Sequence, residues 1–137
     1  MAAAEWRLLG WLESEAIQYD LYSETQFHFE HVPLDRYKAL VISTHPEYWS
    51  RDMYFRLKKW VHEDGGRLIY LGGNGINCEV EFLDDHRVVY HNTNWSHSED
   101  NYDDDGTLRE SRMDRRVESE ANLLGVAFTN AGIMTAA

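Results

Sequence analysis

The chain has 137 residues, with 13 lysines and arginines against 24 aspartates and glutamates, and its formal net charge is −11. This length suits one domain, and a hydrophobic fraction of 43% with 13% aromatic residues excludes a wholly disordered chain. The negative charge argues against a nucleic-acid or anionic-membrane partner. No apolar run approaches the roughly 18 residues of a membrane span. No signal peptide is visible, and there is one cysteine, Cys78, so we expect a cytoplasmic protein.

The first third of the chain predicts a helix and then a strand. Apolar residues recur every three or four positions over residues 3–16, which is the spacing of one helix face. Apolar and polar residues alternate over 17–22, which predicts a strand. Residues 23–37 are polar and contain Pro33. We expect a loop there, with at most one helical turn near 34–37.

The middle of the chain predicts a parallel pair of strands joined by a helix. Residues 39–43 form an apolar run rich in β-branched side chains, as in a strand buried on both faces. Ser50 is a candidate N-cap for a helix that runs to about His62, and a glycine pair then ends it. Residues 67–71 are the next strand. A crossover helix between two strands implies a right-handed parallel connection and an α/β fold of the doubly wound type.

Beyond residue 77 the pattern becomes less regular. The sequence predicts a β-hairpin from residues 80–82 and 87–90, an acidic loop over 96–105, a short helix over 108–116 and a final strand over 122–129. We expect a single α/β domain over 1–137, with its core at about 3–82 and the hairpin, acidic loop and final strand in 83–137.

The most informative stretch is residues 44–50, Thr-His-Pro-Glu-Tyr-Trp-Ser, between the carboxyl end of a predicted strand and the start of a helix. Ligands of open α/β sheets bind in this position. Pro46 restricts His45 to an extended conformation, so His45 and Glu47 can project to the same side. Such a pair can ligate a metal, move a proton or orient water. Alternatively, Glu47 supports the helix terminus and residues 48–49 fill the core.

A glycine-rich turn follows the next predicted strand. Residues 72–75 read Gly-Gly-Asn-Gly, which permits close backbone approach to a ligand. The Asn74 amide can polarise a carbonyl or hold water. An ordinary tight turn is the alternative. Because both strands end at one sheet edge, we expect His45, Glu47 and Asn74 to converge there.

Other polar residues suggest packing or surface roles. Cys78 lies in a predicted strand and has no motif around it, so we interpret it as a buried or semi-buried thiol. His28 and His31 have no convincing ligand partner, so we interpret them as surface histidines. Tyr19 and Tyr22 alternate with polar residues and are interpreted as packing residues.

Residues 40–50 and 60–74, with the strings His-Pro-Glu-Tyr-Trp-Ser and Gly-Gly-Asn, resemble the large (β) subunit of the N,N-dimethylformamidase family. The similarity is to the C-terminal, class I glutamine-amidotransferase-like region of that subunit. It covers roughly residues 5–82, and the tail at 123–129 also fits.

The resemblance implies an iron-dependent amide hydrolase that acts on small formamides. Its iron is held by two tyrosines and one glutamate. By motif, Glu47 corresponds to the metal-binding glutamate, His45 to a histidine beside the metal ligands and Asn74 to an active-site asparagine. Iron would act as a Lewis acid or generate hydroxide.

The chain departs from the family pattern in ways that bear on its activity. The family's ligand tyrosines lie upstream, no matching motif precedes Glu47, and residues 72–75 replace the cysteine nucleophile of glutamine amidotransferases. We therefore expect an incomplete domain that carries part of an active site. A small partner subunit would be another chain, and exposed strand edges favour homo-oligomerisation. The alternatives are a non-catalytic interaction or carbohydrate-associated module of this fold, and an incomplete reading frame.

Overall fold

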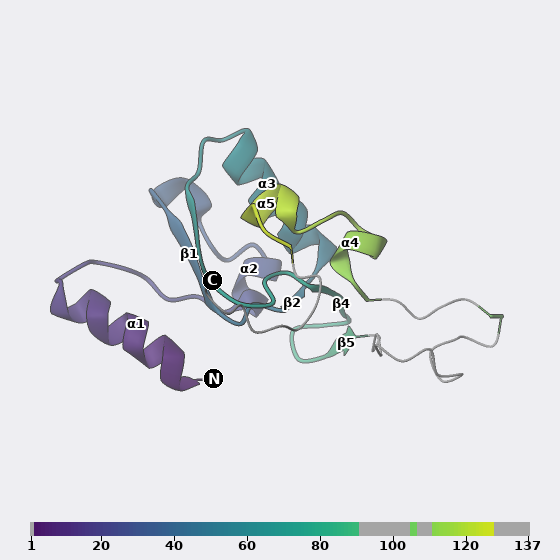
Figure 1. Cartoon of the computed structure of the whole chain (residues 1–137), viewed down its shortest axis with the longest axis horizontal. Coiled ribbons are helices and arrows are strands. Elements are labelled where there is room, and N and C mark those ends of the chain that lie inside the picture. The colour runs from purple at the N-terminus through teal and green to yellow at the C-terminus, as the bar shows by residue number, and fades with distance from the viewer. Residues whose placement is uncertain (1, 91–104, 107–110, 128–137) are drawn as a thin grey trace, which may run out of the picture.

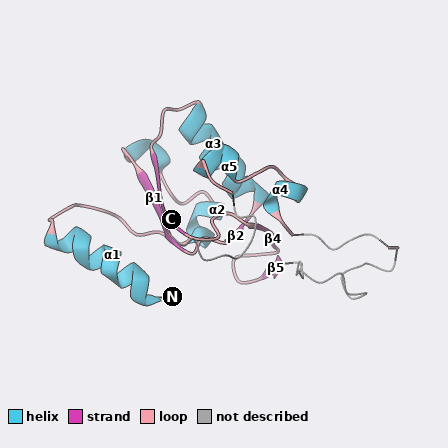
Figure 2. Ribbon diagram, viewed as in Figure 1, coloured by secondary structure: helices cyan, strands magenta, loops and turns pink. Residues whose placement is uncertain are grey.

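The computed structural model describes residues 2–90, 105–106 and 111–127 as a mixed α/β structure (Figures 1 and 2). Its helices are α1 (Ala2–Ser14), α2 (Glu24–His28), α3 (Arg51–His62), α4 (Met113–Arg116) and α5 (Ala121–Leu124), with a 3₁₀ turn, η1, at Leu34–Arg36. Its strands are β1 (Leu40–Thr44), β2 (Tyr48–Trp49), β3 (Leu68–Gly72), β4 (Cys78–Phe82) and β5 (Val88–Tyr90). The predicted α/β class is therefore correct.

The central unit is the predicted parallel pair, β1 and β3, with α3 as its crossover. The strands pair from Leu40 opposite Leu68 to Thr44 opposite Gly72. The predicted N-cap is confirmed, because the Ser50 side chain accepts a hydrogen bond from the Met53 amide. The buried side chains of α3 are Met53, Tyr54, Leu57 and Trp60.

A second, three-stranded sheet has the order β2-β4-β5. β2 runs parallel to β4, with Tyr48 opposite Cys78, and β4 pairs antiparallel with β5, with Phe82 opposite Val88. The predicted hairpin is confirmed. The backbone at Ser111 and Arg112 lies beside the first residues of β4, where the Glu79 amide donates to the Ser111 carbonyl at 2.6 Å.

The prediction that the strand at residues 39–43 is buried on both faces is wrong. Ile42 is 6% exposed, whereas its neighbour Val41 is 41% exposed. Val41, Ile69 and Leu71 lie on the outer face of the pair, and all three are exposed. Among the described elements none covers this face, and α1 lies to one side of it (Figure 1). A full doubly wound sheet therefore does not form from the described residues.

The predicted strand over 17–22 is also wrong. These residues form no strand in the structure, and Ile17 and Leu21 are exposed. Alternation alone does not make a strand, because each strand needs a neighbouring edge for its backbone hydrogen bonds. The segment is held by side chains instead, with the Tyr22 and Tyr37 rings packed edge to face at 6.0 Å.

The segment 23–37, predicted as a loop, contains the helix α2. Ser23 and Gln26 form a reciprocal capping box at the start of α2. The expected helical turn near 34–37 is confirmed as η1.

The predictions for the C-terminal part are only partly correct. The helix predicted over 108–116 is reduced to α4 in the described part, and residues 107–110 lie outside it. The strand predicted over 122–129 is wrong, because α5 occupies its start and Gly125, with φ of 76°, ends that helix. Residues 128–129 and most of the acidic loop, 96–104, lie outside the described residues. Within the described ranges, no helix combines the length and apolar character needed to cross a membrane.

Gly72→Ala tests the packing between the ends of the two parallel strands. A Cβ at Gly72 would lie 2.6 Å from the Thr44 carbonyl oxygen, whereas a Cβ at Gly73 meets no atom within 4 Å. We expect Gly72→Ala to lower the free energy of unfolding by about 1–3 kcal/mol. Gly73→Ala, the matched control, should change it by less than about 0.5 kcal/mol. Urea unfolding measures both, and equal effects would contradict this account.

Candidate active site

The loop after β1 places His45 and Glu47 next to each other. The Glu47 amide donates to the His45 carbonyl at 2.9 Å, and His45 Nδ1 lies 3.5 Å from Glu47 Oε2. The side chain of His45 is 39% exposed and that of Glu47 is 20% exposed. A carboxylate and an imidazole thus stand together where solvent and small molecules can reach them.

The loop after β3 is hydrogen-bonded along its length to this first loop. The Gly73 amide donates to the Thr44 carbonyl at 2.9 Å, and the Cys78 amide donates to the Glu47 carbonyl at 2.9 Å. Between them, the Ile76 amide donates to the Pro46 carbonyl at 2.7 Å. Because β1 and β3 are parallel, both loops leave the same edge of the sheet. The structure therefore brings the segments that carry His45, Glu47 and Asn74 side by side, and their chemical roles stay predictions.

Backbone strain is concentrated in these two loops. Of the five non-glycine residues with positive φ in the described part of the chain, three lie here: Thr44 at 68°, Asn74 at 49° and Ile76 at 53°. Positive φ is unfavourable for side chains branched at Cβ, such as those of threonine and isoleucine. Strained conformations of this kind cluster at functional sites, where the surrounding structure holds them.

Two buried polar atoms beside the loops have no hydrogen-bond partner in the described part of the molecule. They are Trp49 Nε1, in β2, and Asn77 Oδ1, at the end of the second loop. Leaving a buried polar atom unsatisfied costs about 1–3 kcal/mol. Residues adjoining the candidate site therefore retain hydrogen-bonding capacity.

Cys78 is a buried thiol, as predicted, and is 4% exposed. Its Sγ accepts a hydrogen bond from Asn77 Nδ2 at 3.6 Å. Burial raises the pKa of the thiol, which disfavours the nucleophilic thiolate. Cys78 therefore supports the loop rather than acting as a nucleophile.

A buried carboxylate holds the second sheet against the start of α3. Glu79 is 8% exposed, and its two oxygens accept hydrogen bonds from Arg51 Nε at 3.0 Å and Arg116 Nε at 2.7 Å. Paired on both oxygens, this charge is tolerated in the interior. The arrangement fixes β4, and hence the loop before it, relative to α3.

His28 is half-buried rather than a surface residue, which corrects the sequence-based interpretation. Its Nδ1 lies 2.7 Å from Ser50 Oγ, the cap of α3, and its ring stacks on Phe82 at 4.1 Å. Burial is the main reason that the pKa of His28 is lowered. The Ser23–Gln26 capping box was the signal that could have placed α2, and His28 with it.

The candidate site offers one carboxylate and one imidazole as possible metal ligands. Among the described residues, no group of three or more histidine, cysteine, aspartate or glutamate side chains is placed to hold a metal ion. Glu47 supplies the carboxylate of the site, and His45 beside it supplies the imidazole. These two residues alone do not fit an iron centre.

The fold and the loop pair define an α/β domain with a polar, strained site at the carboxyl edge of a parallel sheet. The chain belongs to the family described as "N,N-dimethylformamidase beta subunit-like, C-terminal", whose profile matches residues 1–137. It is 32% identical over 81 residues to the N,N-dimethylformamidase beta subunit of Alcaligenes sp.. That match covers 57% of this chain and 10% of the relative. No solved structure matches the chain.

His28→Gln tests the effect of pH on the cap of α3. Because the pKa of His28 in the folded chain is lowered from 6.5, the unfolded chain takes up a proton first as the pH falls. The contribution of neutral His28 to stability is therefore full above pH 6.5 and is lost as the pH falls toward its lowered pKa. Between about pH 7.5 and about pH 5, His28→Gln should lose less stability than the wild type in urea unfolding.

His31→Gln is the matched control, because His31 is exposed. It should keep the pH dependence of the wild type. A His28→Gln profile that coincides with the wild-type profile would show that this histidine does not set the acid sensitivity.

Proposed function

We propose that this chain forms one wall of the active site of an amide hydrolase that acts on small formamides, as the name of its curated relative suggests. The observation that supports this proposal is the backbone hydrogen bonding between the two loops that contain His45, Glu47 and Asn74, in a chain of this family. Since the matched region is about a tenth of the relative's length, activity, substrate and partners of the whole protein are proposals.

The three side chains suit different parts of amide hydrolysis. Asn74 would donate a hydrogen bond to the substrate carbonyl oxygen, where negative charge develops. His45, with Nδ1 3.5 Å from Glu47, would move a proton or hold Glu47 in place. Glu47 would be one ligand of an iron whose other ligands lie outside the described residues.

The unsatisfied atoms and the exposed sheet face support an assembled rather than a solitary site. Asn77 Oδ1 has no partner in the described part of the chain, and Val41, Ile69 and Leu71 are open to solvent. We propose that a small partner subunit, self-association or further polypeptide completes the domain. The finer fold assignment, a class I glutamine-amidotransferase-like sheet, is consistent with the parallel pair and its crossover helix.

A chimaera tests the proposed function directly. Residues 1–137 would replace the matching region of the large subunit of the Alcaligenes enzyme, and release of dimethylamine from N,N-dimethylformamide would be measured. We expect the chimaera to be active and to contain iron. Glu47→Gln should remove iron and activity together, because it replaces the anionic ligand at nearly constant volume.

Glu63→Gln serves as the charge-matched control, since Glu63 is an exposed residue that follows α3. It should leave both iron and activity unchanged. Iron at wild-type occupancy in Glu47→Gln would refute the ligand assignment. An inactive chimaera that folds and assembles would favour a non-catalytic module.

The isolated chain should bind iron weakly or not at all, because selectivity for a transition metal needs more ligands than Glu47 and His45 provide. Metal analysis of the purified 137-residue chain, after incubation with ferrous iron and gel filtration, measures this. Tight stoichiometric iron would show that the chain holds a complete ligand set.

A further inference from the structure

The loop that carries Asn74 is tied at its middle to the strand before it. Tyr70, in β3, is half-buried and packs against the core on the inner face of the parallel pair, opposite Ile42. Its hydroxyl accepts a hydrogen bond from the Gly75 amide at 2.9 Å. Gly75 is buried, so this bond is shielded from water. A side chain of the sheet therefore holds the residue that directly follows Asn74.

The Tyr70 ring also fixes how closely the loop approaches the sheet. A Cβ at Gly75 would lie 2.6 Å from the Cε2, Cζ and hydroxyl oxygen atoms of this ring. Only a residue without a side chain fits against the ring at this distance. The ring and its hydroxyl thus act on the same residue, the first by close packing and the second by a directed hydrogen bond.

Asn74 lies between two fixed points of the loop. On one side, the Gly73 amide donates to the Thr44 carbonyl at 2.9 Å. On the other side, Gly75 is held by Tyr70. Asn74 has a φ of 49°, a conformation that persists only where the surrounding structure maintains it. The backbone from which the Asn74 amide group projects therefore depends on the contact between Tyr70 and Gly75.

The Tyr70 hydroxyl stays protonated at neutral pH. Burial and, to a smaller extent, the negative charge of Glu120 raise the pKa of this phenol. A neutral phenol presents an oxygen lone pair to the Gly75 amide and keeps its own proton for a second partner. The bond to Gly75 is therefore present throughout the neutral pH range.

We propose that Tyr70 is a positioning residue of the candidate active site, which holds Asn74 in place through Gly75. The inference rests on the proposed function, in which the Asn74 amide donates to the substrate carbonyl oxygen. A donor that is fixed before the reaction stabilises the developing negative charge without first having to reorganise. Tyr70 acts through Asn74 and does not itself touch the substrate, so its loss lowers kcat more than it raises KM.

Tyr70→Phe tests the contact, because it removes the hydroxyl and keeps the ring. In the full chain, the buried Gly75 amide then lacks its acceptor, and its hydrogen exchange, followed by nuclear magnetic resonance, should become at least about fivefold faster. The Ile76 amide, which donates to the Pro46 carbonyl at 2.7 Å, is the internal reference. Its exchange should change by less than about twofold. Equal acceleration of both amides, or an unchanged rate at Gly75, would overturn the proposal.

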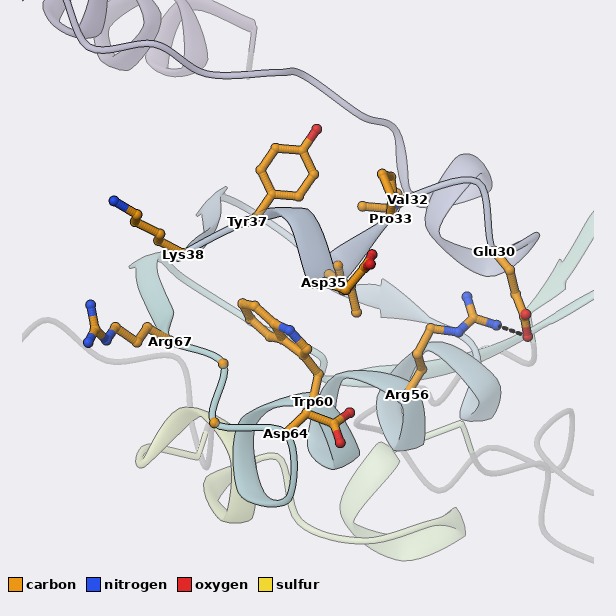
Figure 3. A pocket seen from close by; sticks show the side chains of 13 residues that line it. Glu30, Val32, Pro33, Asp35, Tyr37, Lys38, Arg56, Trp60, Asp64 and Arg67 are labelled. Atoms are coloured by element: carbon orange, nitrogen blue, oxygen red, sulfur yellow. Dashed lines mark hydrogen bonds and ion pairs between the residues drawn. The ribbon is translucent and has the colours of Figure 1, made fainter.

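Tyr37→Phe is the matched control. Tyr37 is also half-buried, and its hydroxyl donates to an Asp20 carboxylate oxygen at 2.5 Å. It lines the pocket at the amino ends of β1 and β3, whereas Asn74 follows the carboxyl end of β3 (Figure 3). Its loss should leave hydrogen exchange at Gly75 within about twofold of the wild-type rate. An acceleration equal to that in Tyr70→Phe would show a general loss of stability and would count against the proposal.

The kinetic measurement uses the chimaera with the Alcaligenes large subunit. Tyr70→Phe should lower kcat at least about fivefold and leave KM within about twofold, and Tyr37→Phe should change neither by more than about twofold. In a chimaera that already carries Asn74→Ala, Tyr70→Phe should lower the residual kcat by less than about twofold, because its effect is transmitted by Asn74. An equal loss in both backgrounds would show that Tyr70 does not act through Asn74.

A parent chimaera without activity would refute the proposed function, and with it the role of Tyr70 in catalysis. The exchange measurement distinguishes the two failures, because it reports whether the hydroxyl holds Gly75 without any need for turnover.

Discussion

Backbone hydrogen bonds between the loops after β1 and β3 organise the rest of the molecule. The carbonyls of Thr44, Pro46 and Glu47 accept from amides of the opposite loop at 2.7–2.9 Å. Along the chain, these bonds follow the pairing of β1 with β3 and precede the pairing of β2 with β4. Because main-chain atoms make the connection, the side chains of His45 and Glu47 are left available for chemistry.

The close approach of the loops after β1 and β3 limits which residues the loop after β3 can contain. Gly72 has no room for a Cβ beside the Thr44 carbonyl, and a Cβ at Gly75 would lie 2.6 Å from the Tyr70 ring. The Gly75 amide donates to the Tyr70 hydroxyl at 2.9 Å, so a core-facing residue of β3 also holds the loop that follows it. The glycines therefore serve loop packing, and their presence alone does not indicate a phosphate or nucleotide site.

Local sequence patterns correctly predicted the elements whose formation is specified by their own residues. The apolar run of β1, the Ser50 cap of α3 and the strand ends beside His45 and Asn74 were all readable in the sequence. The strand predicted over 17–22 failed because strand formation depends on a distant edge, which no local pattern reports. For the same reason, the pairing of Ser111 with β4 and the unsatisfied Asn77 Oδ1 could not be predicted.

The strained backbone of the candidate site costs free energy, so the surrounding residues must hold it in place with hydrogen bonds. Each residue with a strained backbone costs about 1–3 kcal/mol, against a net stability of about 5–15 kcal/mol for a typical domain. Thr44, Asn74 and Ile76 can hold such conformations only where neighbouring interactions prevent relaxation. The bonds from the Gly73 amide to the Thr44 carbonyl and from the Ile76 amide to the Pro46 carbonyl are interactions of this kind. Rigid support of a strained, polar loop pair is what the proposed active site would require.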